Sequence, residues 1–435
     1  MCHNFQCNEV MKRFYLLFAL TVFSLFVSAQ SLEECRSLAK EHYPEISQYD
    51  LISKTEEYNL SNATRAWIPQ VMLSGQATYQ SATPTYPDAF KKIMQSNGMN
   101  MVGIDKDQYK IAIDVTQSIW DGGQSKANRA IAEAEAKEQR SRVDVSLYDL
   151  QSRVDDIYFG ILLLDERIEQ TNALIDMLES NLNRMRSYYN NGIAMLSDVD
   201  AIEAELLSAK QTLTQVEASR ASYRQMLEIF IGQPLKDKIL KRPNMCEVTN
   251  RTSLRPELSL FDAQQNKFKA QSKAINSSVM PQFSAFAQGY YGYPGMDMFK
   301  SMVSDDWSLN AIVGVRMMWN IGAFYTKKNN IEKLNIAQKQ IDVQRNVFLF
   351  NTQLQTTQYD GEIIRLNKAI KDDDRIVELR TRVRKAAESQ LENGVIDATD
   401  LLRKITDETT AILNRSTHEI ELLQATYKLK NTLNQ

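Results

Sequence analysis

The sequence is poor in histidine, cysteine and glycine, and these scarcities exclude several classes of protein. Its three histidines stand far apart, at positions 3, 42 and 418, and offer no cluster for a metal ion. There is no glycine-rich phosphate loop, and no serine, histidine and aspartate follow the spacing of a known catalytic set. We therefore expect neither an enzyme nor a protein with a cofactor.

An excess of one charge is also absent, since 51 Lys and Arg residues face 54 Asp and Glu residues. A nucleic-acid partner is therefore not indicated. Only one long apolar run occurs, at 14–27, between Lys12-Arg13 and the small residues Ser28-Ala29. This order is typical of a secretory signal peptide, which we place at 1–29, with Met1 and Met11 both open as starts. A membrane anchor is the alternative, but the run is short for a span.

After the signal, the chain has no second stretch of 18 apolar residues. The mature protein is therefore soluble or crosses a membrane as strands. Two of the four cysteines, Cys35 and Cys246, remain after cleavage. Export favours disulfides, but spacing does not determine whether these two are bridged, and two free buried thiols are the favoured interpretation.

Proline is confined to short parts of the chain. All nine prolines lie at 44, 69, 84, 87, 234, 243, 256, 281 and 294. Because a proline inside a helix costs ~3 kcal/mol, the two proline-free arms of the chain predict very long helices.

Landmarks recur in the same order along the chain. Pro44-Glu45-Ile46 returns as Pro256-Glu257-Leu258, Ile68-Pro69-Gln70 as Met280-Pro281-Gln282, Trp120-Asp121-Gly122-Gly123 as Trp319-Asn320-Ile321-Gly322, and Asn191-Gly192-Ile193 as Asn393-Gly394-Val395. Fixed-order recurrence indicates an internal duplication, with repeats at 30–243 and 244–435. Each repeat is expected to contain a helix (45–66 in the first), two strands and a long helical hairpin.

The predicted strands are 69–80, 109–120, 281–292 and 307–319. Apolar or small residues alternate there with polar ones, as in Tyr109, Ile111, Ile113 and Val115 against Lys110 and Asp114. This is the pattern of strands with one wet and one apolar face. About 12 tilted residues cover ~30 Å, the thickness of a membrane, and tyrosines and tryptophans gather at the strand ends. A soluble sandwich, the alternative, would need more strands.

The proline-free arms contain residues that predict where the helices begin, how they pack and where they turn. Asp121 is expected to cap the first long helix and Asn320 the second, with Gly122, Gly123 and Gly322 turning the chain after Trp120 and Trp319. Apolar residues then step by three and four, the seam of a coiled coil. The expected seam is Ile157, Ile161, Leu164, Ile168, Ile175, Leu178, Leu182 and Met185. Tight turns near 192 and 394 close two antiparallel hairpins.

Four amphipathic strands cannot close a barrel, and open edges are not tolerated in lipid. Two chains would supply eight strands and three would supply twelve, and the residues alone do not choose between them. Lys110, Asp114 and Arg316 fall on the polar face, where they line a lumen or form rim contacts. Asp372-Asp373-Asp374 is interpreted as a solvated helix face.

Together these features resemble the TolC family of outer membrane factors, or outer membrane efflux proteins. The resemblance implies an α+β membrane protein: a homotrimer with a twelve-stranded transmembrane β-barrel, four strands from each protomer, continued by a long α-helical coiled-coil barrel into the periplasm. It implies a passive export conduit for drugs, small molecules or proteins in outer membrane lipid. It also implies a periplasmic adaptor (membrane fusion protein) and, through it, an inner-membrane pump of the RND, ABC or MFS type.

The hairpin tips allow a comparison by residue. The family pattern of a tyrosine and glycine followed by Asp-Val-Leu resembles Tyr189 to Val199, and the second tip carries Gly394 and Asp400. The resemblance implies that Asp400 rings the periplasmic entrance, that Asp198 helps hold it closed, and that the adaptor docks at both tips. Arg403 stands where a second acidic ring is common, and Ile396 where a basic residue is common, so one partly neutralised ring is expected. Helix capping is the alternative role of both aspartates.

Two other functions stay open at this stage. A periplasmic adaptor would have one hairpin between glycine-rich half motifs, and a structural coiled-coil envelope protein would lack the four strands.

Overall fold

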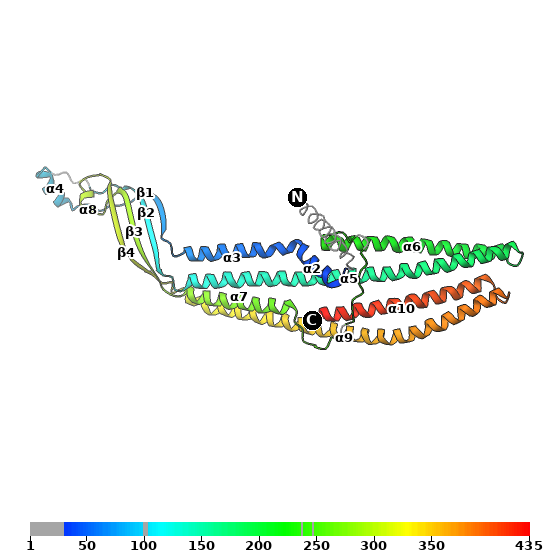
Figure 1. The fold of residues 1–435 in the computed structure, drawn as a ribbon. Coiled ribbons are helices and arrows are strands. Elements are labelled where there is room, and N and C mark those ends of the chain that lie inside the picture. Colours follow the sequence, from blue (N-terminus) through cyan, green and yellow to red (C-terminus); the bar gives the residue numbers. More distant parts are fainter. Residues whose placement is uncertain (1–29, 99–102, 236–237, 246–247) are drawn as a thin grey trace, which may run out of the picture. The chain divides into compact units, whose positions relative to one another are not determined.

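The computed structural model describes residues 30–98, 103–235, 238–245 and 248–435. The signal peptide at 1–29 and Cys246 lie outside the described residues. Figure 1 shows the helices and strands of the chain. The elements are α2 (Leu32–His42), η1 (Pro44–Ser47), α3 (Gln48–Arg65), β1 (Gln70–Tyr79), α4 (Asp88–Ser96), β2 (Asp107–Trp120), α5 (Gln124–Asn190), α6 (Leu196–Ile231), α7 (Pro256–Ser278), β3 (Gln282–Tyr293), α8 (Met298–Ser301), β4 (Ser308–Met318), α9 (Ala323–Glu392) and α10 (Ala398–Leu433).

Among the helices of the described residues, none combines the length and apolarity that a membrane crossing needs.

The order helix, strand, strand, very long helix, shorter helix occurs in both halves of the chain. The very long helices have 67 and 70 residues, and the returning helices 36 each. The compact units are divided differently: one comprises 1–48, 142–259 and 345–435, and the other 49–141 and 260–344. Each unit therefore takes segments from both predicted repeats. The duplication itself stays an inference from the sequence.

The unit 49–141 with 260–344 contains one antiparallel sheet in the order β1-β2-β3-β4. Its register pairs apolar residues with apolar residues: Leu73 pairs with Ile113, and Ala287 pairs with Val313. Directly opposed residues of antiparallel strands share a face, so the alternation found in the sequence becomes two continuous faces. A bulge between Ser118 and Trp120 ends the regular pairing of β2 with β3.

The unit 1–48, 142–259 and 345–435 contains the hairpins α5–α6 and α9–α10 (Figure 1). The predicted seam of α5 is buried at Ile157, Ile161, Ile175, Leu178, Leu182 and Met185. It packs against α6 through Val199, Ile202, Leu206 and Ala209. A smaller core joins Leu366 of α9 to Leu422 and Ala425 of α10. The coiled-coil spacing therefore predicted the contacts within each hairpin.

The start of the chain differs from the prediction. A helix, α2, precedes the expected one, and its Ser31 and Glu34 form a reciprocal capping box. Pro44 ends α2, because a residue before proline avoids helical backbone angles, and Tyr43 is extended. The predicted helix at 45–66 consequently begins as the 3-10 turn η1 and becomes α-helical only at Gln48. The short helices α4 and α8 in the loops were also not predicted.

Candidate functional site

The sheet exposes its apolar face along all four strands. Leu309, Val313 and Leu73 are 81 %, 78 % and 71 % exposed in the single chain. A soluble protein rarely leaves such a continuous apolar surface uncovered. This face therefore needs lipid or another apolar cover.

The opposite face of the sheet carries a polar network. Lys110 Nζ donates to Gln288 Oε1 at 3.0 Å, and Gln288 Nε2 donates to Asp114. Lys110 also lies 4.5 Å from the ring centroid of Tyr290, and Arg316 lies 4.6 Å from that of Phe286. Alternation thus places cations, an anion and amides on one side, as a water-filled lumen requires.

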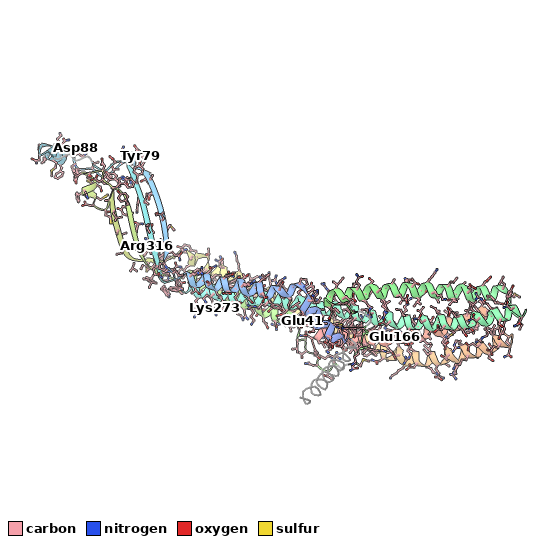
Figure 2. The ribbon with its side chains drawn as sticks, turned by 45° about the horizontal axis from the view of Figure 1, so that its top comes forward. Glu41, Tyr79, Asp88, Glu166, Lys273 and Arg316 are labelled. Atoms are coloured by element: carbon pink, nitrogen blue, oxygen red, sulfur yellow. The ribbon has the colours of Figure 1, made fainter. Side chains whose placement is uncertain are left out.

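Aromatic rings mark both ends of the sheet. Trp307 packs against Tyr109 and Tyr291, with centroids 6.0 and 5.4 Å apart, and Trp120 packs against Phe283 at 6.0 Å. Figure 2 shows Tyr79 and Arg316 toward opposite ends of the sheet. Rings at two levels match the aromatic belts that lie at the two surfaces of a membrane.

The turn from β2 into α5 is built by Asp121 and two glycines. The Asp121 carboxylate accepts from the N–H groups of Gly123 (2.9 Å) and Ser125 (2.6 Å), as predicted for a cap. Partial burial raises its pKa, but the hydrogen bonds from Ser125 and Gly123 outweigh burial and lower the pKa below the usual aspartate value. Gly122 has φ +70°, and a Cβ there would lie 2.7 Å from Met280 Cβ. Only glycine fits this turn.

The matching turn from β4 into α9 is built differently. Trp319 Nε1 donates to the carbonyl of Val279 at 3.0 Å, which ties the turn to the end of α7. Gly322 lacks the positive φ of its counterpart. Among the residues that the structure describes, none donates a backbone hydrogen bond to the side chain of Asn320, so the expected second cap is not formed there. The two repeats therefore reach the same strand-to-helix turn by different local contacts.

Both hairpin tips are tight turns closed by glycine. Gly192 and Gly394 have φ of 74° and 68°, and nothing lies within 4 Å of a Cβ built on either. The next residues donate backward, Ile193 N to Tyr188 O and Val395 N to Gln390 O, both at 2.9 Å. Asn191 and Asn393 each bond the carbonyl four residues earlier. These bonds satisfy the last carbonyls of α5 and α9.

The two tip aspartates have different partners. Asp198 accepts from the N–H of Met195 at 3.0 Å, so it stabilises the first turn of α6. At the second tip the capping residue is Asp397, whose carboxylate accepts from Asp400 N at 2.8 Å. Asp400 and Arg403 are both exposed. In the part of the chain that the structure describes, no ion pair within 4.0 Å joins Arg403 to Asp400.

The two hairpins contact each other near their tips. Leu401, Ile405 and Ala387 of the second hairpin pack with Leu174 and Met177 of the first. An ion pair of 3.0 Å between Arg184 and Glu392 adds a link at the surface. The tip aspartates are therefore carried by one packed group of helices.

Sequence reasoning missed a buried ion pair. Arg36 of α2 donates to Asp155 of α5 through Nε at 2.7 Å and a terminal nitrogen at 2.5 Å. The same Arg36 donates to Asn431 of α10 at 3.1 Å. The side chains of Arg36 and Asp155 are 8 % and 4 % exposed, and their ion pair joins elements that are far apart in the sequence. No local sequence motif predicts such a pairing.

The environment of Asp373 also differs from the one predicted from the sequence. It is buried and bonds His418 Nδ1 at 2.6 Å, while Asp374 pairs with Arg415. The interpretation of Asp372-Asp373-Asp374 as a solvated face is therefore wrong for Asp373. Cys35 is buried and unbridged, and burial raises the pKa of its thiol to about 12.

The chain is similar to known proteins in sequence and in fold. A family model described as "Outer membrane efflux protein" matches residues 36–233. This segment belongs to the outer membrane efflux protein family. The TolC-like assignment made from the sequence is confirmed, and the predicted outer-membrane location agrees with this family.

Solved channels share the fold over nearly the whole chain. VceC of Vibrio cholerae is 13 % identical, with a TM-score of 0.67 over 92 % of this chain and 95 % of that one. MtrE of Neisseria gonorrhoeae, in its open state, is 14 % identical, with a TM-score of 0.64 and coverages of 92 % and 88 %. CmeC of Campylobacter jejuni is 11 % identical, with a TM-score of 0.66 and coverages of 92 % and 85 %. The predicted combination of strands and long helices is thereby confirmed.

A search of curated proteins found no match.

Proposed function

We propose that this protein is the outer-membrane duct of a tripartite efflux or type I secretion system and acts as a passive conduit. Three copies would close a twelve-stranded barrel, with β4 of one protomer pairing with β1 of the next. The observation that carries this proposal is the four-stranded sheet, with its exposed apolar face and its network of Lys110, Gln288 and Asp114 behind. Only a closed barrel lets such a sheet lie in lipid with satisfied edges.

The helices support assembly independently. Val347, Phe350, Leu354 and Ile364 of α9 are 53–61 % exposed. The first three are spaced by three and four, which is the seam of a helix with a coiled-coil neighbour. The single chain leaves this seam uncovered, and an adjacent protomer would bury it.

The two rival functions lack support in the structure. An adaptor requires one hairpin, and this chain has two, α5–α6 and α9–α10. A structural coiled-coil protein has no need of the sheet formed by β1 to β4.

A pair of adjacent substitutions tests the duct. Val313 lies on the apolar face and Ile312 on the polar face, next to each other in β4. A lysine in place of Val313 should cost ~2–4 kcal/mol near the middle of the bilayer. We expect Val313→Lys to lose the heat-modifiable, detergent-extracted oligomer, whereas Ile312→Lys keeps it. Equal behaviour of the two variants would show that lipid does not cover the apolar face.

The proposed entrance is the ring of Asp400 side chains, with Arg403, also exposed, one turn further along α10. Three side chains gathered on the axis would narrow the entrance, and their carboxylates would attract cations. Asp400→Ala is expected to raise the open probability and to reduce cation preference in planar bilayers, and Arg403→Ala to increase that preference. Unchanged conductance and selectivity in both variants would remove these residues from the entrance.

The hairpin tips are proposed as the adaptor's docking surface, and through it they would reach an inner-membrane pump. Ile193 and Val395 are 72 % and 69 % exposed at the two tips, which is unusual for apolar residues without a partner. Ile193→Asp combined with Val395→Asp should abolish co-purification of an adaptor and leave the oligomer intact. Unchanged co-purification would contradict this docking site.

A further inference from the structure

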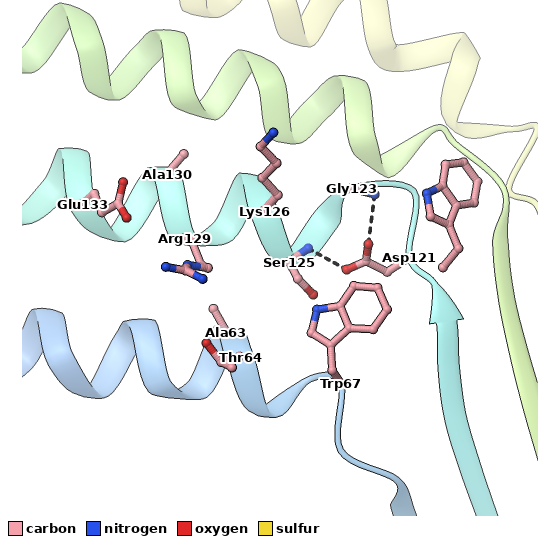
Figure 3. Close-up of a pocket in the computed structure, with 11 residues that line it drawn as sticks. Ala63, Thr64, Trp67, Asp121, Gly123, Ser125, Lys126, Arg129, Ala130 and Glu133 are labelled. Atoms are coloured by element: carbon pink, nitrogen blue, oxygen red, sulfur yellow. Dashed lines mark hydrogen bonds between the residues drawn. The ribbon is translucent and has the colours of Figure 1, made fainter.

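A groove of about 620 Å³ lies between the end of α3 and the start of α5, within the unit that contains the sheet. Figure 3 shows Arg129 extending from α5 toward Thr64 of α3, and Trp67 beside Asp121 and Ser125. The residues around the groove are Ala63, Thr64, Trp67, Trp120, Asp121, Gly123, Ser125, Lys126, Arg129, Ala130 and Glu133. Its size is that of a small-molecule site.

The register of the sheet places this groove beside the apolar face. Trp120 pairs with Phe283, and Phe283 pairs with Met317, which is 58 % exposed on that face. Trp120 and Trp67 are themselves 42 % and 41 % exposed. Tryptophans of this kind mark the level at which hydrocarbon meets headgroups. The groove therefore lies where the proposed barrel would leave the membrane.

Two cations and two carboxylates line the groove, and they differ in their partners and in their place along it. Among the described residues, Lys126 and Arg129 have no carboxylate partner within 4.0 Å. The carboxylate of Asp121 is already bonded to the backbone N–H groups of Gly123 and Ser125. Glu133 stands at the end of the groove away from Trp67 (Figure 3). Figure 3 shows Arg129 on the side of α5 that faces α3 and the groove, and Lys126 extending from the other side of α5 toward α7. A cation beside two indole rings complements a phosphate group attached to an apolar chain.

We propose that this groove binds the headgroup phosphate of an anionic phospholipid, whose acyl chains lie along the apolar face of the sheet. Arg129 holds the phosphate, Lys126 adds positive charge from the other side of α5, and Trp67 and Trp120 pack against the upper part of the chains. The site rests on the proposed function, because it requires the sheet to be in a bilayer. Bound lipid would seal the junction between barrel and helices.

The second repeat provides a matched control. Tyr325 stands at the position of Lys126, and Lys328 at the position of Arg129, at the offset of 199 that relates Trp319 to Trp120. The indole N–H of Trp319 already donates to the Val279 carbonyl, whereas no hydrogen bond is formed by that of Trp120 within the described residues. Lys328 therefore carries the same positive charge as Arg129, but the tryptophan of its turn is already hydrogen-bonded within the chain.

Tryptophan quenching by brominated lipid measures the binding. The chain has four tryptophans, so Trp307→Phe with Trp319→Phe leaves only the two at the groove as reporters. The trimer with these two changes is placed in nanodiscs in which brominated phosphatidylglycerol replaces phosphatidylcholine stepwise. Preference for phosphatidylglycerol should fall about fivefold with Arg129→Ala and about 25-fold with Lys126→Ala added, at about fivefold for each basic residue. Lys328→Ala should change it less than about twofold, since Lys328 does not line the groove that holds the two reporters.

The outcomes separate the site from the function. Heat-modifiable trimer in every variant shows that the barrel is intact, and loss of that trimer in the unaltered protein would reject the proposed function first. With trimer present, equal losses for Arg129→Ala and Lys328→Ala would show general surface attraction and overturn the site. Equal quenching by brominated phosphatidylcholine would do the same. Displacement of the lipid by excess inorganic phosphate would assign the groove to a soluble anion and also overturn the proposal.

Discussion

The buried pair of Arg36 and Asp155 gives the sharpest prediction about stability. Replacing Asp155 by asparagine keeps the volume and some hydrogen bonds but leaves a guanidinium that is 8 % exposed without a counter-charge. Removing one partner of a buried pair costs ~3–5 kcal/mol, because the remaining charge stays out of water. We therefore expect Asp155→Asn to lower the free energy of unfolding by about that amount.

The adjacent residue supplies the control. Asp156 is 51 % exposed, and it pairs with Lys428 at 3.1 Å on the surface. Such pairs contribute ~0–1 kcal/mol, so Asp156→Asn should leave stability almost unchanged. Both variants remove one negative charge from the same turn of α5, and they differ in burial and in the cation that each aspartate pairs with.

The assay is guanidinium chloride unfolding in detergent, followed by helical circular dichroism. Protein and detergent concentrations stay fixed, because the stability of an oligomer depends on concentration. Replacing both partners, as Arg36→Met with Asp155→Leu, should recover most of the loss, since apolar residues of similar volume need no counter-charge. If Asp155→Asn and Asp156→Asn prove equally mild, the pair is not the buried contact that joins α2 to α5.

Further predictions concern three residues, Gly122, Cys35 and Leu178. Gly122→Ala should destabilise by more than the ~1–2 kcal/mol of a left-handed alanine, because its Cβ would also meet Met280, whereas Gly322→Ala should be nearly neutral in thermal melts. Cys35 should resist alkylation at pH 8 until the protein unfolds, because its thiol pKa is about 12, and rapid labelling of native protein would contradict the buried placement. Folding raises the pKa of the same thiol from 9.0, so its contribution leaves stability intact below pH 9. That contribution to the free energy of unfolding should then fall by about 1.4 kcal/mol per pH unit toward pH 12, and Cys35→Ala should reduce the overall slope by this amount. Leu178→Ala, in the fully buried seam of α5, should cost ~2–5 kcal/mol in the same denaturant titration.

Much of the architecture could be predicted from local sequence. Alternation predicted four strands, and each observed strand begins and ends within two residues of its predicted bounds. Proline placement predicted the two very long helices, and the Asn-Gly pairs predicted the hairpin tips at 192 and 394. These signals are local, because each depends on backbone freedom or on a periodicity within one element.

The short helices and the N-terminal segment were predicted less well. Tyr43-Pro44 interrupts what looked like one helix, and the capping box of Ser31 and Glu34 was overlooked. The cap expected at Asn320 failed for another reason. The residues resemble those around Asp121, but Ile321 replaces a glycine, so the positive φ of the first turn is not available.

The sequence by itself determined which residues form strands, which form helices and which side of each element is apolar, because both periodicities are properties of a single element. Tertiary structure alone decided which distant residues meet, such as Arg36 with Asp155 and Asp373 with His418. It also decided that Trp67 and Arg129 line one groove while Lys328 stands apart from it. The physical reason is that burial and pairing of charges depend on the packing of several elements together, and no spacing along one of them records it.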